Sequence, residues 1–278
     1  MNNIPKKNYA TVLASTNYLD GVRTLLFSLT KVKSNYPLIV IVPVGFDIAC
    51  QQAIKAWGGI IEYAENWEKV DLGDLIKKNK RPHWNNTFIK LCIFNLVQFE
   101  KIVYIDSDMI VLENIDHLFD KNHISAVQGG KLIFHWEDIN SGLMVIKPNQ
   151  KEFSELVNLI PTVCKKKIES NEGFGDQDVI SYYYKYVNKQ WEGENRLDER
   201  YNAMIRCIHE LCVILGYKNL KIIHFTGDKK PWMFSPMEAL KYVAYYALHH
   251  ERYRCLCAFK YFKYVYLAKL KLKNDTEP

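Results

Sequence analysis

The chain has 278 residues, 48% of them apolar and 13% aromatic, and a net charge of +6. This composition supports a large hydrophobic core and excludes an intrinsically disordered chain, while the nearly neutral body predicts no nucleic-acid partner. No stretch reaches the roughly 18 uninterrupted apolar residues of a membrane span and the N-terminus has no apolar segment typical of a signal peptide, so we expect a cytoplasmic protein.

The first hundred residues alternate strand and helix patterns. Apolar runs bounded by turn residues predict strands at 9–16, 37–44 and 58–64. Apolar residues at helical spacing predict helices at 22–32, 47–57 and 87–97. Polar residues at 65–87 predict an irregular loop with a short helix. Strands that alternate with helices are typical of an α/β sheet.

The second half continues this pattern without a linker, repeat or low-complexity segment. Further strands are predicted at 101–105, 109–112, 125–130, 141–148 and 220–227. Further helices are predicted at 149–160 and 175–187. We therefore predict one α/β domain over residues 1–238, followed by a basic, aromatic C-terminal tail at 239–278.

The segment KIVYIDSDMIV (101–111) places Asp106 and Asp108 inside an apolar run. Because side chains alternate along an extended segment, both carboxylates would lie on one side, at the sheet edge where open α/β folds bind ligands. Buried carboxylates need a partner, and two oxygen donors suit a divalent ion that is also bound to phosphate. A polar turn capped by Ser107 or Asp108 is the other interpretation.

The segment HFTGDKKPW (224–232) follows LKII in the last predicted strand. His224 would stand at a strand end, where a neutral imidazole is a good ligand for an ion such as Mn²⁺. Gly227 would let the backbone approach a phosphate, and Lys230 would supply a positive charge. A basic surface turn that contains a histidine is the alternative.

Two further segments carry short polar groups at element ends. Asn140 and Ser141 precede a predicted strand and suit sugar hydroxyls, although Asn-Ser-Gly is also a common turn. Asp176 and Gln177 stand at a predicted helix start, where Asp176 is either an N-cap or, with Gln177, a sugar ligand.

Six motifs in this order resemble glycosyltransferase family 8, above all its glycogenin and galactinol synthase branches. They are TNY after the first strand, RP and a lysine before the aspartates, DSD with NIDHLF, NSG, GDQ, and HFTGDKKPW. The resemblance covers about residues 8–233. It implies a GT-A fold, with a Rossmann-like mixed central sheet flanked by helices. It also implies retaining transfer of a hexose, glucose first and galactose second, from a UDP-sugar with Mn²⁺ or Mg²⁺.

The resemblance also implies roles for individual residues. The metal ligands would be Asp106, Asp108 and His224. The catalytic residues at the sugar would be Asp176 and Gln177. The donor would be bound by Leu13, Ser15, Asn17, Tyr18, Arg81, Lys90, Asp106, Ser107, Asn140, Ser141, Gly227 and Lys230. Glycogenin often has an aspartate where this chain has Gly173, which removes one sugar contact.

Two other functions remain open from the residues. An apolar strand followed by DxD also marks metal-dependent phosphatases, although there the motif usually lies near the start of the domain. A non-catalytic nucleotide-sugar-binding protein is the second alternative. The acceptor would be a hydroxyl of a saccharide, polyol or protein.

The tail is the most basic part of the chain. Eight Lys or Arg and three Asp or Glu follow residue 239, which gives +5 of the total +6. Residues 252–273 mix seven of these cations with Tyr, Phe and Leu. Such a segment either lies on an anionic membrane surface or packs as an ordinary terminal helix on the domain or on a second subunit in a homodimer.

Overall fold

The computed structural model describes residues 6–65 and 72–272. Residues 1–5, 66–71 and 273–278, which include parts of the predicted loop at 65–87 and of the predicted tail, lie outside the described residues.

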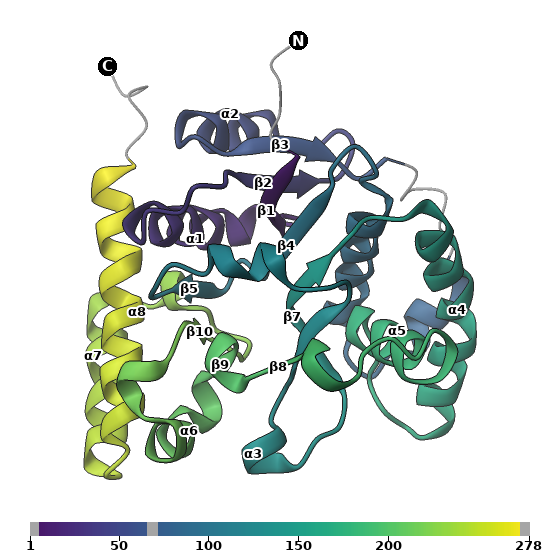
Figure 1. The fold of residues 1–278 in the computed structure, drawn as a ribbon. Helices are drawn as coiled ribbons and strands as arrows, with labels where there is room; N and C mark the ends of the chain where they lie inside the picture. Colours follow the sequence, from purple (N-terminus) through teal and green to yellow (C-terminus); the bar gives the residue numbers. More distant parts are fainter. Residues whose placement is uncertain (1–5, 66–71, 273–278) are drawn as a thin grey trace.

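A seven-stranded mixed sheet forms the centre of the molecule (Figure 1). In spatial order its strands are β3 (Ile60–Tyr63), β2 (Leu38–Val42), β1 (Lys7–Val12), β4 (Lys101–Ile105), β7 (Ile139–Ile146), β6 (Ser125–Gln128) and β8 (Arg196–Leu197). The strands β1 to β4 run parallel, whereas β7 is antiparallel to both β4 and β6. The predicted mixed α/β sheet is confirmed.

Helices cover both faces of this sheet because its strands are apolar on both sides. Alternate residues of β4 enter different core clusters: Ile102 and Tyr104 join one, and Val103 and Ile105 the other. The first cluster packs against α4 (Gln150–Glu169), α5 (Asp176–Tyr182) and the 3-10 helix Pro82–Asn95. The second packs against α1 (Leu19–Lys31) and α2 (Ile48–Ala56).

A small second sheet begins where the central strand of the first sheet ends. It consists of β5 (Met109–Val111), β10 (Ile222–His224) and β9 (Ala203–Met204). Strand β10 runs antiparallel to β5, with His224 opposite Met109, and parallel to β9. The last residue of β10 is therefore held beside the turn that follows β4.

The C-terminal helices α7 (Pro236–Leu248) and α8 (Arg252–Lys271) form a pair along one edge of the molecule (Figure 1). One face of α8 is buried against α1 and the short helix α6 (Ile208–Leu215). Its Tyr264 makes an edge contact with Phe27, and Lys269 pairs with Asp20 at 2.9 Å. Across the described residues, none of the helices is both long and apolar enough to cross a membrane.

Several predicted boundaries differ from the structure. The first strand ends at Val12 instead of residue 16, because Ser15 caps the 3-10 helix Thr16–Tyr18. The helix expected at 149–160 continues to Glu169 through Pro161, burying Val163 and Cys164 in its last turns. The helix expected at 87–97 has 3-10 geometry over Pro82–Asn95, and the last five residues of the helix expected at 175–187 form a π-helical turn.

Gly21 of α1 allows the helix to approach the turn between β4 and β5. A Cβ atom there would lie 2.6 Å from Trp232 and 2.7 Å from the carbonyl oxygen of Ser107. We predict that Gly21→Ala lowers the free energy of unfolding by about 1–3 kcal/mol through overpacking, measured by urea unfolding. Thr30→Ala, at an exposed position of the same helix, is the control. A gain in stability for Gly21→Ala, as helix propensity alone predicts, would contradict this close approach.

Candidate active site

Asp106 and Asp108 lie on the turn that joins the two sheets. The turn is closed by a hydrogen bond from Met109 N to the Asp106 carbonyl oxygen, at 3.1 Å. Phe225, which directly follows β10, donates from its backbone N to the Asp108 carbonyl oxygen at 3.0 Å. With the turn held on both sides, the carboxylates of Asp106 and Asp108 and a ring nitrogen of His224 come within 4.8 Å of one another. These three predicted metal ligands are thus brought together.

Asp108 is buried between two basic side chains. Its Oδ1 is 3.2 Å from Nε2 of His224, and its Oδ2 accepts a hydrogen bond from Nζ of Lys230 at 2.7 Å. Burial opposes the charge on Asp108, but His224 and Lys230 outweigh it and lower the pKa of this carboxyl below its ordinary value. Burial likewise opposes the charge on Lys230, and Asp108 raises its pKa. The carboxylate therefore stays ionised.

Lys90 is the centre of a second buried ion cluster. Its Nζ lies 3.0 Å from Asp106 Oδ1 and 3.0 Å from Asp176 Oδ2, and Ser141 Oγ donates to the same Asp176 oxygen at 2.7 Å. Burial acts to lower the pKa of Lys90, but the two carboxylates outweigh it and raise the pKa above the ordinary value. Lys90 therefore connects the proposed metal side of the site to the proposed sugar side.

The remaining predicted sugar residues surround this cluster. Gln177 is exposed, and its Oε1 accepts from Ser141 N at 3.3 Å. Asn140 is half-buried, and its Oδ1 accepts from Gly142 N at 3.0 Å and from Asn202 Nδ2 at 2.7 Å. Asp176, Gln177, Asn140 and Ser141 thus lie next to one another although they come from α5 and β7.

Of the residues predicted for the nucleoside end, three are at least partly exposed and one is buried. Ser15, Asn17 and Tyr18 lie on the loop after β1, where Asn17 is exposed and its carbonyl oxygen accepts from Trp232 Nε1 at 2.8 Å. Tyr18 makes an edge contact with the Trp232 ring. This contact joins the first loop to the segment that carries Lys230. Leu13, in contrast, is fully buried in the core.

Three other predicted donor residues lie on different segments of the chain. Arg81 lies over the ring of Trp84, and its side chain fills the space in which a Cβ of Gly173 would stand. Gly227 is exposed and has a φ of 120°, a conformation that favours glycine. Ser107 is buried within the turn between the two aspartates.

Two residues of the site were not predicted from the sequence. Tyr104 donates to Asp106 Oδ1 at 2.5 Å, and burial followed by the charge of Asp106 raises the pKa of this phenol. Asn202 joins Asn140 to His224. Both belong to segments that looked like ordinary core or turn, and only their contacts across the fold bring them into the site.

The arrangement places three carboxylates and two ammonium groups around one region at the strand ends. Oxygen donors of Asp106 and Asp108, with the imidazole of His224, suit a hard or borderline divalent ion such as Mn²⁺ or Mg²⁺. Lys230 adds a positive charge on the same side, which suits a phosphate group. The short polar groups near Lys90 suit hydroxyl groups.

Comparison with known proteins gives one family for most of the chain. The model of the family described as Glycosyl transferase family 8 matches residues 10–235. Inositol phosphorylceramide glucuronosyltransferase 1 of Arabidopsis thaliana is 28% identical over 250 residues, covering 82% of this chain and 42% of that protein. Glycogenin-1 of Caenorhabditis elegans is 26% identical, covering 81% of this chain and 50% of that protein. Galactinol synthase 1 of Solanum lycopersicum is 26% identical, covering 83% and 75%.

Solved structures show the same fold. The galactosyltransferase LgtC, in complex with donor and acceptor sugar analogues, superposes with a TM-score of 0.61 at 15% identity, covering 98% of this chain and 97% of that chain. The glycosyltransferase GlyE of Streptococcus pneumoniae TIGR4 gives 0.55 at 17% identity, covering 98% and 66%. At these identities the likeness is one of fold, and the expected GT-A fold is confirmed.

The Lys90 cluster generates a stability prediction. Lys90→Met should lower the free energy of unfolding by about 3 kcal/mol or more, because it leaves Asp106 and Asp176 without their cation. Since the pKa of Lys90 is raised, its charge and the loss should be constant between about pH 6 and pH 9, measured by urea unfolding without added metal.

The matched control is Lys229→Met, which breaks an exposed ion pair with Glu238. Such a pair is worth at most about 1 kcal/mol. Equal losses in the two variants would show that Lys90 does not balance the buried carboxylates.

Proposed function

The chain belongs to glycosyltransferase family 8, and on this premise we propose that it is a retaining hexosyltransferase that uses a UDP-sugar and a divalent metal ion. Mn²⁺ is the expected ion and Mg²⁺ the alternative. The observation that carries the proposal is the meeting of Asp106, Asp108 and His224 beside the buried ammonium of Lys230. The donor atoms fit such an ion because they combine two carboxylates with one imidazole.

The charged residues would act on the diphosphate of the donor. Asp106, Asp108 and His224 would hold the metal ion, which when bound supplies Lewis-acid stabilisation of the departing UDP. Lys230 now pairs with Asp108 at 2.7 Å, and its ammonium would shift its contact toward a diphosphate oxygen. Gly227, exposed and without a side chain, would let a phosphate lie against the backbone.

The residues around Lys90 would act on the sugar. In the transfer, an acceptor oxygen forms a bond to the anomeric carbon, the bond to UDP breaks, and the acceptor proton leaves with the departing phosphate. Retention requires that attack and departure share one face of the sugar. Asp176, whose Oδ2 lies 3.0 Å from Nζ of Lys90, would stabilise the positive charge that develops on the ring. Gln177, Asn140 and Ser141 would bind hydroxyl groups.

The nucleoside would lie against the loop after β1. Ser15, Asn17 and Tyr18 supply polar groups and a ring there, and Arg81 would supply a guanidinium to the donor. Leu13 and Ser107 are both buried. They would therefore support this pocket by packing against the residues beside them.

Glucose is our first choice for the transferred sugar and galactose the second. The names of the relatives include glycogenin and galactinol synthase, but also a glucuronosyltransferase, so UDP-glucuronate belongs in a donor panel. The acceptor is a hydroxyl of a saccharide, polyol or protein. The family match includes both the aspartate turn and β10, which disfavours the DxD phosphatase and leaves a non-catalytic nucleotide-sugar-binding protein as the weaker alternative.

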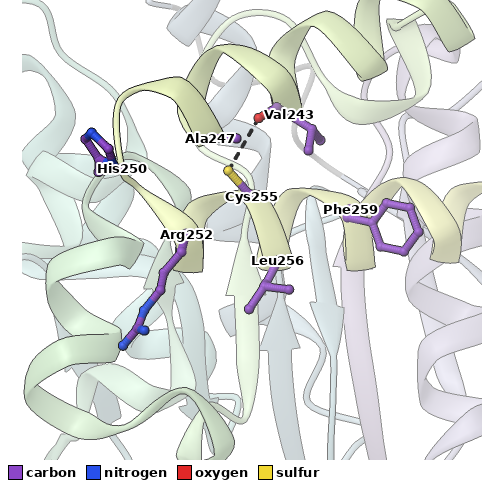
Figure 2. A pocket seen from close by; sticks show the side chains of 7 residues that line it. All are labelled: Val243, Ala247, His250, Arg252, Cys255, Leu256 and Phe259. Carbon is purple, nitrogen blue, oxygen red and sulfur yellow. Dashed lines mark hydrogen bonds between the residues drawn. The ribbon is translucent and has the colours of Figure 1, made fainter.

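We also propose that the outer surface of α7 and α8 contacts a membrane or a second copy of the chain. Large apolar side chains are exposed there, among them Leu248, Leu256 and Phe259. These helices enclose a pocket of about 530 Å³. Figure 2 shows Leu256 and Phe259 with Val243 and Ala247 around it, and His250 and Arg252 toward one end. Apolar groups beside a cation such as Arg252 suit an anionic lipid surface.

The catalytic proposal predicts that Asp108→Asn lowers Mn²⁺-dependent release of UDP from UDP-glucose on the order of a hundredfold or more. The assay compares UDP-glucose, UDP-galactose, UDP-glucuronate and a phosphomonoester, each with and without Mn²⁺. Asp74→Asn, at an exposed position, is the control and should keep full activity. Normal turnover in Asp108→Asn would contradict the metal assignment. Release of phosphate from the monoester alone would identify a phosphatase.

The surface proposal predicts that the unsubstituted chain sediments with anionic liposomes and that a Leu248→Ser, Phe259→Ser double variant does so several-fold less, because its exposed apolar area is smaller. Neutral liposomes are the control for charge, and gel filtration reports the oligomeric state. If both proteins stay in the supernatant to the same extent and both are monomers, this surface contacts neither a membrane nor a second copy of the chain.

A further inference from the structure

Asn202 joins the two sheets at the centre of the site. It directly precedes β9, whose parallel pairing with β10 places Met204 opposite His224. The side chain is 1% exposed, so each of its polar atoms needs a partner inside the protein. Its Oδ1 lies 2.8 Å from Nδ1 of His224, and its Nδ2 lies 2.7 Å from Oδ1 of Asn140. One amide therefore contacts both a proposed metal ligand and a proposed sugar ligand.

The direction of these hydrogen bonds follows from the one donor whose identity is certain. The backbone N–H of Gly142 can only donate, so the Asn140 atom that it contacts at 3.0 Å is the oxygen. The Asn202 atom that faces this oxygen must then be the NH₂ group, which leaves its oxygen to face His224. Nδ1 of His224 is therefore the protonated nitrogen.

This chain of bonds determines which nitrogen of His224 is free to bind a metal. With Nδ1 used as the donor to Asn202, Nε2 is the nitrogen whose lone pair is left for a metal ion. Nε2 is the atom that faces Asp108, at 3.2 Å from its Oδ1. Hydrogen bonds to the non-ligating nitrogen commonly set the orientation of metal-binding histidines.

We propose that Asn202 is a positioning residue that orients His224 for the metal ion and Asn140 for the sugar through its two polar atoms. The inference rests on the proposed function, in which His224 is a metal ligand. Because the oxygen of Asn202 acts on the metal side and its NH₂ group on the sugar side, the two effects can be separated by substitution.

Two variants separate them. Asn202→Leu removes both hydrogen bonds, whereas Asn202→Asp keeps an acceptor for His224 Nδ1 and loses the donor to Asn140. Asn188→Leu is the control, because this half-buried amide bonds Glu152 and Tyr183 outside the proposed site. The three readouts are the affinity for Mn²⁺ in the presence of UDP by calorimetry, the nitrogen modulation of bound Mn²⁺ in pulsed electron paramagnetic resonance, and kcat for UDP-sugar turnover. Circular dichroism checks folding.

In wild type we expect nitrogen modulation from one imidazole, which His224→Gln abolishes. Asn202→Leu should weaken Mn²⁺ binding roughly 10–100-fold and reduce this modulation. Asn202→Asp should keep the affinity and the modulation but lower kcat for UDP-sugar turnover by about tenfold or more, because Asn140 is displaced. The Asn188 control should match wild type in all three measurements.

The outcomes distinguish this inference from the proposed function. If wild type binds no Mn²⁺ with UDP, both are wrong. If wild type binds and Asn202→Leu retains wild-type affinity and modulation, the role of Asn202 alone is wrong. Should Asn202→Leu fail to fold, Asn202→Asp decides: loss of the nitrogen modulation would overturn the inference, and its retention with impaired turnover would support it.

Discussion

Buried charge at the carboxyl end of β4 is the constraint on which the site depends. Asp106, Asp108 and Asp176 lie at or near the surface of a dense core, where uncompensated carboxylates are strongly unfavourable. Lys90 balances two of them and Lys230 the third. The pKa of Asp108 is lowered as a result, so the carboxylate remains ionised and oriented. A bound divalent ion would add positive charge beside Asp106 and Asp108. The diphosphate of the donor would add negative charge, which Lys230 could then bind.

The two sheets supply different parts of the site, and the turn between them brings these parts together. The central sheet carries Asn140 and leads into Asp106, while the small sheet carries His224 and leads into Phe225, which binds the backbone of Asp108. The packing of α1 against Ser107 and Trp232 holds the turn from outside. Substitutions that only move one sheet relative to the other should therefore affect metal and sugar binding together.

Much of this arrangement could be predicted from the sequence, because the apolar runs show where strands end. The apolar run KIVYI places the aspartates at one strand end and LKII places His224 at another. That the second strand belongs to a separate small sheet was not predicted. The contacts of Asn202 could not be predicted, since its partners lie 22 and 62 residues away in the sequence. The strands β8 and β9 have two residues each and carry no periodicity. Nothing in the sequence showed that Arg81 fills the space beside Gly173.

The most direct test of the account is a crystal structure with Mn²⁺ and UDP, in which anomalous scattering locates the ion. The account predicts one ion bound by Asp106, Asp108 and Nε2 of His224 and by oxygens of the diphosphate, with Lys230 contacting the same diphosphate. An ion bound elsewhere, or UDP bound with no ion at these three side chains, would contradict it.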